Sequence, residues 1–355
     1  MKKIITLLLC LCVALGLVAC GGETPAAEAT YKLGMGVVVD LNSSATNNAQ
    51  VDATVATVVL DADSKIVACR IDAVQNKMDV TGGAVDTTAT FQTKMEKGDA
   101  YGMAAAVNFG MDWNGDGVVK EWYDQAKAFE AYVVGKTAEG VKAIETQEVP
   151  GHGYLIAKDD ALLTAGCTIQ ITDFKAAVAK ACEDAQGTTF KTAKAFTLGV
   201  AATSFVDADT KAATAENGLV CMYSDFACAV VSEGKVLASL NDAIQPKITI
   251  SAAGEIVEKA FVATKRELKE DYHMAAYGQS MDWNGDGEVK EWYLQSKAFS
   301  DYVVGKTATE IAAIETQQVP SGYIIAKDDA LLSAGCTIQI TSIKAVVAQS
   351  ATNAR

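Results

Sequence analysis

The chain repeats itself at a spacing of 170 residues. Residues 111–149 and 281–319 align without a gap, and 29 of those 39 positions are identical. This period exceeds that of solenoid repeats and matches the size of a whole domain. The sequence therefore predicts a tandem duplication, in which a residue with a function in both copies should occur in both.

The order of expected elements is the same in each copy. A glycine-flanked strand precedes a β-rich stretch with hairpin turns, and a long amphipathic helix, a short helix, a strand and a last helix follow. The pattern favours an α+β fold of two tandem homologous domains, each a meandering antiparallel sheet with packed helices. In the first copy these elements are expected at residues 31–39, 51–71, 119–134, 138–144, 168–171 and 174–182.

Composition and the repeat together set the expected boundaries. Each repeat unit, near 155 residues, is long enough to bury its own core. A polar stretch, Gln-Gly-Thr-Thr-Phe-Lys-Thr-Ala-Lys, lies between them. We expect a signal peptide at 1–19, a tether at 20–30, a first domain at 31–185, a linker at 186–194 and a second domain at 195–355.

The N-terminus is typical of an exported lipoprotein. Lys2 and Lys3 precede an apolar run that is too short to span a bilayer, and Leu-Val-Ala-Cys then ends at Cys20, as in a bacterial lipobox. A lipidated Cys20 carries two acyl chains, enough for durable anchoring. We expect attachment to the outer face of the bacterial cytoplasmic membrane; an ordinary signal peptide cut nearby is the alternative.

Charge argues against nucleic acid as a partner. Without residues 1–19 the chain has 28 Lys and Arg against 44 Asp and Glu, a net charge of −16. Phosphate binding needs clustered basic residues, so an acidic surface excludes that class of partner. About half of the residues are hydrophobic, which predicts packed cores and not a disordered chain.

Cysteine and histidine offer little chemistry that both copies share. Cys167 and Cys336 alone occupy equivalent places, so most of the six cysteines beyond Cys20 are expected to be small buried hydrophobic residues, although an exported protein permits disulfides. His152 and His273 are not equivalent. A histidine-based zinc site and a paired Ser-His triad are therefore not expected.

An acidic loop occurs in both copies. Asp-Trp-Asn-Gly-Asp-Gly matches the front half of an EF-hand loop, with oxygens at positions 1, 3 and 5 and glycine at 6. The back half departs from it, with Lys at position 9 and Tyr at position 12. Weak calcium binding and an Asx-rich turn before a helix both remain open. The candidate ligands are Asp112, Asn114, Asp116, Asp282, Asn284 and Asp286.

The C-terminal part of each copy carries a second shared motif. An Asp pair and a short apolar stretch lead to Ala-Gly-Cys-Thr, and a segment ending in Ala-Ala-Val-Ala or Ala-Val-Val-Ala follows. Here the chain resembles the FMN-binding domain family, whose hallmark is Asp, a short gap, Ser-Gly-Ala-Thr and a helix. The resemblance extends over most of each half, including the glycine-rich strand and hairpin.

The family occurs in exported flavoproteins, in lipoproteins of extracellular electron transfer and in subunits of ion-pumping NADH complexes. In covalent members a flavin transferase joins the FMN phosphate to the final Thr. Ser-Gly-Ala-Thr is Ala-Gly-Cys-Thr in both copies here, and the Asp lies further upstream. The residues that the resemblance assigns to FMN are Asp160, Gly166, Cys167, Thr168, Asp329, Gly335, Cys336 and Thr337.

The resemblance implies a membrane-anchored flavin carrier that exchanges electrons with redox partner proteins at the cell surface. Trp113, Trp283, Tyr101 and Tyr272 are either stacking partners for a planar ring or core residues. A non-redox binding or structural lipoprotein that lost its flavin, and a calcium-dependent module, remain as alternatives. No nucleophile–base pair recurs in both copies, so a carrier or binding protein is favoured over a stand-alone enzyme.

Overall fold

A computed structural model describes residues 27–276 and 281–355. The expected signal peptide, Cys20 and most of the tether lie outside the described residues. Within the described part, no helix combines the length and the hydrophobicity that a membrane crossing needs. We call residues 31–185 the first half and residues 195–355 the second half.

The first half is built on an antiparallel sheet with the strand order β3-β2-β1-β6. Its first three strands form the expected meander of consecutive hairpins. The fourth strand lies within the segment that the sequence predicts as a linker, and it pairs with β1. The strands are β1 (Ala29–Asp40), β2 (Asn48–Leu60), β3 (Ile66–Asp79) and β6 (Thr188–Thr192).

The second half repeats the three-stranded meander, in the order β10-β9-β7, and adds a small sheet in the order β12-β11-β8. Its two long hairpin strands are joined by a tight turn at Glu233 and Gly234, as the sequence predicts. The strands are β7 (Thr197–Val206), β8 (Gly218–Val220), β9 (Met222–Ser232), β10 (Lys235–Ile244), β11 (Lys247–Ile250) and β12 (Ile256–Ala260).

The helices follow the same order in both halves, each with a two-stranded hairpin among them. The first half has η1 (Thr81–Gly83), α1 (Lys94–Lys97), η2 (Gly98–Tyr101), η3 (Met103–Phe109), α2 (Trp122–Val133), α3 (Ala138–Lys142), β4 (Thr146–Glu148), β5 (Leu155–Ala157), α4 (Asp160–Thr164) and α5 (Thr172–Asp184). The described residues of the second half contain α6 (Lys265–Leu268), η4 (Lys269–Tyr272), α7 (Trp292–Tyr302), α8 (Ala308–Ala312), β13 (Thr316–Gln318), β14 (Ile324–Ala326), α9 (Asp329–Ser333) and α10 (Thr341–Thr352).

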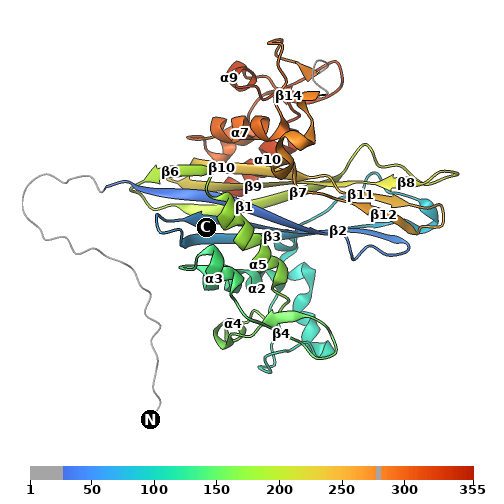
Figure 1. The fold of residues 1–355 in the computed structure, drawn as a ribbon, viewed down its shortest axis with the longest axis vertical. Coiled ribbons are helices and arrows are strands. Elements are labelled where there is room, and N and C mark those ends of the chain that lie inside the picture. Colours follow the sequence, from blue (N-terminus) through green and yellow to red (C-terminus); the bar gives the residue numbers. More distant parts are fainter. Residues whose placement is uncertain (1–26, 277–280) are drawn as a thin grey trace, which may run out of the picture.

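The two large sheets lie in the middle of the molecule, with the helices of the first half on one side and those of the second half on the other (Figure 1). Side chains alternate across a strand, so each sheet has two faces. In both large sheets each face is buried in a hydrophobic core. One face of each sheet joins a central core shared by both halves, which includes Leu33, Val55, Leu198 and Phe226. The other faces pack on their own helices, as two further cores.

A glycine in each first strand lets the last helix lie directly on the sheet. A Cβ added at Gly34 would overlap the carbonyl oxygen of Ala181 in α5 and lie 2.7 Å from the amide nitrogen of Ala185. A Cβ at Gly199 would overlap the carbonyl oxygen of Ser350 in α10. These glycines therefore set the distance between helix and sheet in both halves.

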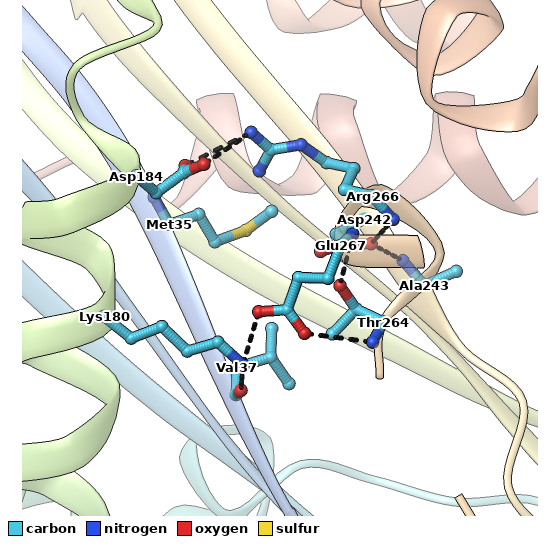
Figure 2. Close-up of polar contacts among 9 residues, drawn as sticks. All are labelled: Met35, Val37, Lys180, Asp184, Asp242, Ala243, Thr264, Arg266 and Glu267. Carbon is cyan, nitrogen blue, oxygen red and sulfur yellow. Dashed lines mark hydrogen bonds and ion pairs between the residues drawn. The ribbon is translucent and has the colours of Figure 1, made fainter. Parts of the chain in front are cut away.

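Polar contacts join the halves across the sheets (Figure 2). Arg266, from α6 of the second half, donates to both carboxylate oxygens of Asp184 at the end of α5, at 2.9 and 3.2 Å. Lys180 forms an ion pair with Glu267 at 2.5 Å. In the reverse direction, Gln349 of α10 donates to Glu96 of α1 at 2.9 Å. Each half therefore holds the last helix of the other.

We expect Arg266→Met to lower the free energy of unfolding by about 2 kcal/mol, because it leaves Asp184 and the buried Asp242 without their cation. Urea unfolding followed by tryptophan fluorescence measures this. The control is Lys297→Met, which removes an exposed pair with Asp301 and should cost about 0.5 kcal/mol or less. Equal losses for the two variants would show that the contact between halves is not stabilising.

The α+β class with antiparallel sheets and packed helices is confirmed. The long helix buries Trp122, Ala126, Phe129 and Val133, as its spacing predicts. The strand predicted at residues 168–171 is wrong, because that segment has no ladder partner. The last helix begins at Thr172, two residues earlier than predicted.

Candidate functional site: an aromatic and acidic pocket in the first half

A cavity of about 480 Å³ opens in the first half, between the ends of β1 and β2, the segment η3, helix α2 and the start of α5. Its volume lies within the range of about 300–1,000 Å³ that is typical of small-molecule sites. Five aromatic side chains line the cavity and form much of its apolar wall. They are Tyr101, Trp113, Trp122, Tyr154 and Phe174.

The polar groups deepest in this pocket belong to Gln125 and Thr168. The amide oxygen of the fully buried Gln125 accepts from the backbone nitrogens of Thr168 and Ile169, at 2.8 and 3.0 Å, and from the Thr168 hydroxyl at 3.3 Å. Gln295 holds Thr337 in the same way. Because the Gln125 side chain accepts from the amides of Thr168 and Ile169, these two residues do not donate to a neighbouring strand.

Three carboxylates and one ammonium group also line the pocket. Asp40, the last residue of β1, is the cross-strand partner of Asp52 in β2, and Asp173 lies in the first turn of α5. One oxygen of Asp52 accepts from Gln50 at 2.7 Å, whereas the other is buried without a hydrogen-bond partner. Burial, followed by the Asp40 carboxylate, raises the pKa of Asp173. The charges in the pocket are therefore unbalanced toward negative.

Lys94 is the lysine of this pocket, and it lies against rings. Its Nζ is 5.2 Å from the ring centroid of Tyr101 and 5.5 Å from that of Trp122. These distances are within the range of cation–π attraction. The side chain is half-buried. Lys94 is thus held at the aromatic wall while the Asp52 oxygen lacks a partner.

In the second half, aromatic residues stand at the strand positions of these carboxylates. Phe205 lies six residues after Gly199, as Asp40 lies six residues after Gly34. Its cross-strand partner is Tyr223, as that of Asp40 is Asp52. Their rings stack with centroids 4.8 Å apart. Because these two positions differ between the copies, the residues that recur in both copies gave no indication of them.

The counterpart of Lys94 in the second half is deeply enclosed. Lys265 is 7% exposed, and its Nζ lies 4.6 Å from the rings of Tyr223 and Tyr272 and 5.6 Å from that of Trp292. Burial lowers its pKa to about 8, and the buried Asp225 is the strongest opposing influence. An ammonium group surrounded by rings and near a carboxylate thus occupies this region.

His152 joins the aromatic residues at the mouth of the first-half pocket. Its ring centroid is 4.9 Å from that of Trp113 and 6.1 Å from that of Tyr154, both lining residues. The segment 150–154 is one residue longer than its counterpart in the second half and alone carries the histidine. His152, dismissed from the sequence because it does not recur, therefore lies beside the candidate site.

Of the residues assigned to FMN by resemblance, Thr168 lines the pocket. It is 3% exposed, and Thr337 is similarly buried. Gly166 and Gly335 adopt positive φ, and the stem of a lysine covers each: a Cβ at Gly166 would lie 2.6 Å from Cδ of Lys120. The close approach that these glycines permit is therefore to Lys120 and Lys290.

The remaining assigned residues lie elsewhere. Asp160 and Asp329 are exposed in the first turns of α4 and α9 and do not line the pocket. Cys167 and Cys336 are fully buried, and burial raises the pKa of each thiol to about 12. The six cysteines of the described residues are buried free thiols, which confirms the expectation that most are small core residues.

The acidic loops use their carboxylates to cap their own backbone. Asp112 accepts from the amides of Gly115, Asp116 and Gly117, and Asp282 does the same in the second half. Asn114 and Asn284 each keep one buried amide oxygen without a partner. Among the residues that the structure describes, no three His, Cys, Asp or Glu side chains cluster for a metal. Calcium at Asp112, Asn114, Asp116, Asp282, Asn284 and Asp286 stays a prediction.

A buried aspartate recurs at the base of each α1-like helix, outside the pocket. Asp72 accepts from the amides of Ala73 and Met95 at 2.7 and 3.2 Å, and Asp242 likewise from those of Ala243 and Arg266. Burial raises the pKa of Asp72 to about 7 and that of Asp242 to about 6. Both carboxyls thus bind a proton more tightly in the folded protein than in the unfolded chain.

A raised pKa stabilises the folded state at low pH, and this stability is lost as the pH rises through the folded value. We expect the free energy of unfolding to fall between pH 5 and pH 8. Asp72→Asn, which keeps an oxygen acceptor, should reduce this fall by about 2 kcal/mol. Urea unfolding at both pH values measures it, with the exposed Asp63→Asn as control. Parallel pH profiles for Asp72→Asn and wild type would contradict the prediction.

The description of the pocket rests on the geometry of this chain alone. Models of protein families, curated proteins and solved structures were all compared with this chain, and no match was found.

Proposed function

We propose that this chain is an exported, lipid-anchored protein that binds a small organic molecule in the pocket of its first half. The observation that carries the proposal is the cavity itself: about 480 Å³, lined by five aromatic rings, three carboxylates and one lysine. Ligand sites typically combine apolar walls with a few convergent polar groups. The lipid on Cys20 would hold the pocket at the outer face of the cytoplasmic membrane.

A flavin electron carrier is the second candidate, with redox proteins at the cell surface as partners. Thr168, the acceptor that the FMN-binding resemblance assigns, lines the same pocket as Trp113 and Tyr101. Those rings suit a planar ring system, which would supply electron transfer when bound. A phosphate fits less well, because three carboxylates line the pocket and the Thr168 hydroxyl already donates to Gln125.

A thermal-shift screen of small molecules tests the binding proposal, with riboflavin and FMN among them. Ligands of the pocket should raise the melting temperature of the wild type. They should not raise that of the double variant Asp40→Phe and Asp52→Tyr, whose larger side chains fill the pocket. Absence of any such difference would reject binding in the pocket. For the flavin candidate, protein purified from its native host is denatured on a gel: fluorescence together with a mass increment on the Thr168 peptide would support covalent FMN.

A further inference from the structure

The region of the second half that corresponds to the pocket contains the side chain of Lys265. There the ammonium of Lys265 lies within 5.6 Å of three ring centroids, and the buried Asp225 exerts the strongest carboxylate influence on its charge. Rings and a carboxylate offset part of the cost of removing this cation from water. The site in the second half is thus occupied by a cation of the chain itself.

The first half keeps the equivalent lysine and two of these rings, and adds an open cavity beside them. Tyr101 and Trp122 correspond to two of the three rings, and Asp52 stands in place of the third, Tyr223. This exchange removes a ring and adds a carboxylate whose inner oxygen has no partner. Asp40 and Asp173 lie on the same lining, against the single ammonium of Lys94. The pocket therefore has more carboxylates than its own lysine can balance.

We infer that the ligand of this pocket is a small organic cation, an amine or a guanidine on an aromatic or other apolar body. The inference rests on the proposed binding function and adds the chemical class of the ligand. The cationic group would lie beside the carboxylates of Asp40, Asp52 and Asp173, and the body would pack against Trp113, Trp122 and Phe174. An anion would meet three carboxylates, and one lysine already committed to Tyr101 and Trp122.

Two sets of probes with constant bodies and varied charge test this class. The first set is 2-phenylethylamine, 2-phenylethanol and 3-phenylpropanoate; the second is tryptamine, tryptophol and indole-3-propionate, with tryptophan as a zwitterion. Calorimetric titration of the purified protein should give amines that bind at least about tenfold more tightly than the matched alcohols, and carboxylates that bind more weakly still.

Asp52→Asn should remove most of the preference for amines while leaving the alcohols unchanged. Asp63→Asn is the matched control, because it removes one exposed carboxylate from the turn between β2 and β3, which does not line the pocket, and should leave all affinities unchanged. Circular dichroism and melting of each variant confirm that it is folded.

Three outcomes would overturn the inference. Alcohols or carboxylates that bind as tightly as the amines would show a pocket without charge preference. Tryptophan equal to tryptamine would indicate a zwitterion site, with Lys94 holding the carboxylate. If no amine binds, the inference that the ligand is a cation is also rejected. Binding in the pocket is tested separately, by the thermal-shift screen that compares the wild type with the variant whose pocket is filled by Asp40→Phe and Asp52→Tyr.

Discussion

The double substitution Asp40→Phe and Asp52→Tyr is expected to abolish ligand binding and leave the fold intact. The second half already carries Phe and Tyr at these two cross-strand positions, where the rings stack 4.8 Å apart. The same pair in the first half would occupy the space between β1, β2 and the wall that holds Lys94. The tyrosine ring introduced at position 52 would then take the place beside Lys94 that Tyr223 takes beside Lys265.

The expected loss of affinity is at least about 100-fold, because the ligand loses both its space and two of the three lining carboxylates. Stability should stay the same or rise by about 1 kcal/mol, since a stacked ring pair replaces two neighbouring carboxylates. Titration with any ligand found in the wild-type screen measures the first effect, and urea unfolding measures the second.

The double substitution Asp40→Asn and Asp52→Asn is the matched control, because it removes the same charges without filling the space. If the ligand needs the cavity, it should retain more binding than the filled variant. A filled variant that is folded and still binds with wild-type affinity would place the ligand elsewhere on the protein, and the proposed function would fall.

Gly34→Ala and Gly199→Ala are expected to destabilise the protein by at least about 3 kcal/mol each. In each half a Cβ would overlap a backbone carbonyl oxygen of the last helix, which no rotamer change can relieve. The helix would have to move away from the sheet and open the packing of Ala177 and Ala181, or of Val346 and Val347. Urea unfolding curves measure the loss.

Gly140→Ala serves as the control for these glycines. Gly140 lies within α3, and the nearest atom to an added Cβ is 3.4 Å away, so the alanine should be neutral or stabilising by up to about 1 kcal/mol. If Gly34→Ala does not accumulate as folded protein, limited proteolysis of Gly199→Ala still reports the loss. Losses below about 1 kcal/mol at both sites would contradict the close contact between helix and sheet.

Comparison of the two copies predicted the framework well. The glycine of the first strand recurs in both, and in both it lies directly beneath the last helix. The helix face of Trp122 and Phe129 was also correct, because hydrophobic spacing reports directly on burial. The strand predicted at residues 168–171 was wrong. Its β-branched residues favour a strand, but the amide oxygen of Gln125, 43 residues before Thr168, accepts from the backbone amides of Thr168 and Ile169.

The residues shared by the two copies did not identify the candidate pocket. Of those assigned to FMN in the first half, Thr168 lines the cavity. The residues that set the character of the cavity are those that differ, with Asp40 and Asp52 standing opposite Phe205 and Tyr223. A search for charged residues replaced by aromatic ones between the copies would have found them, although not that they share one cavity.

The sequence by itself determined the duplication, the α+β class, the sheet meanders and the acidic character of the chain, because these depend on local periodicity, turn residues and composition. Tertiary structure alone decided that the two sheets share a core, that the segment between the halves forms β6, and that residues 40, 52, 94 and 173 meet around one cavity. Those contacts join residues far apart in the chain. Their geometry depends on how complete layers pack, and no local pattern encodes that packing.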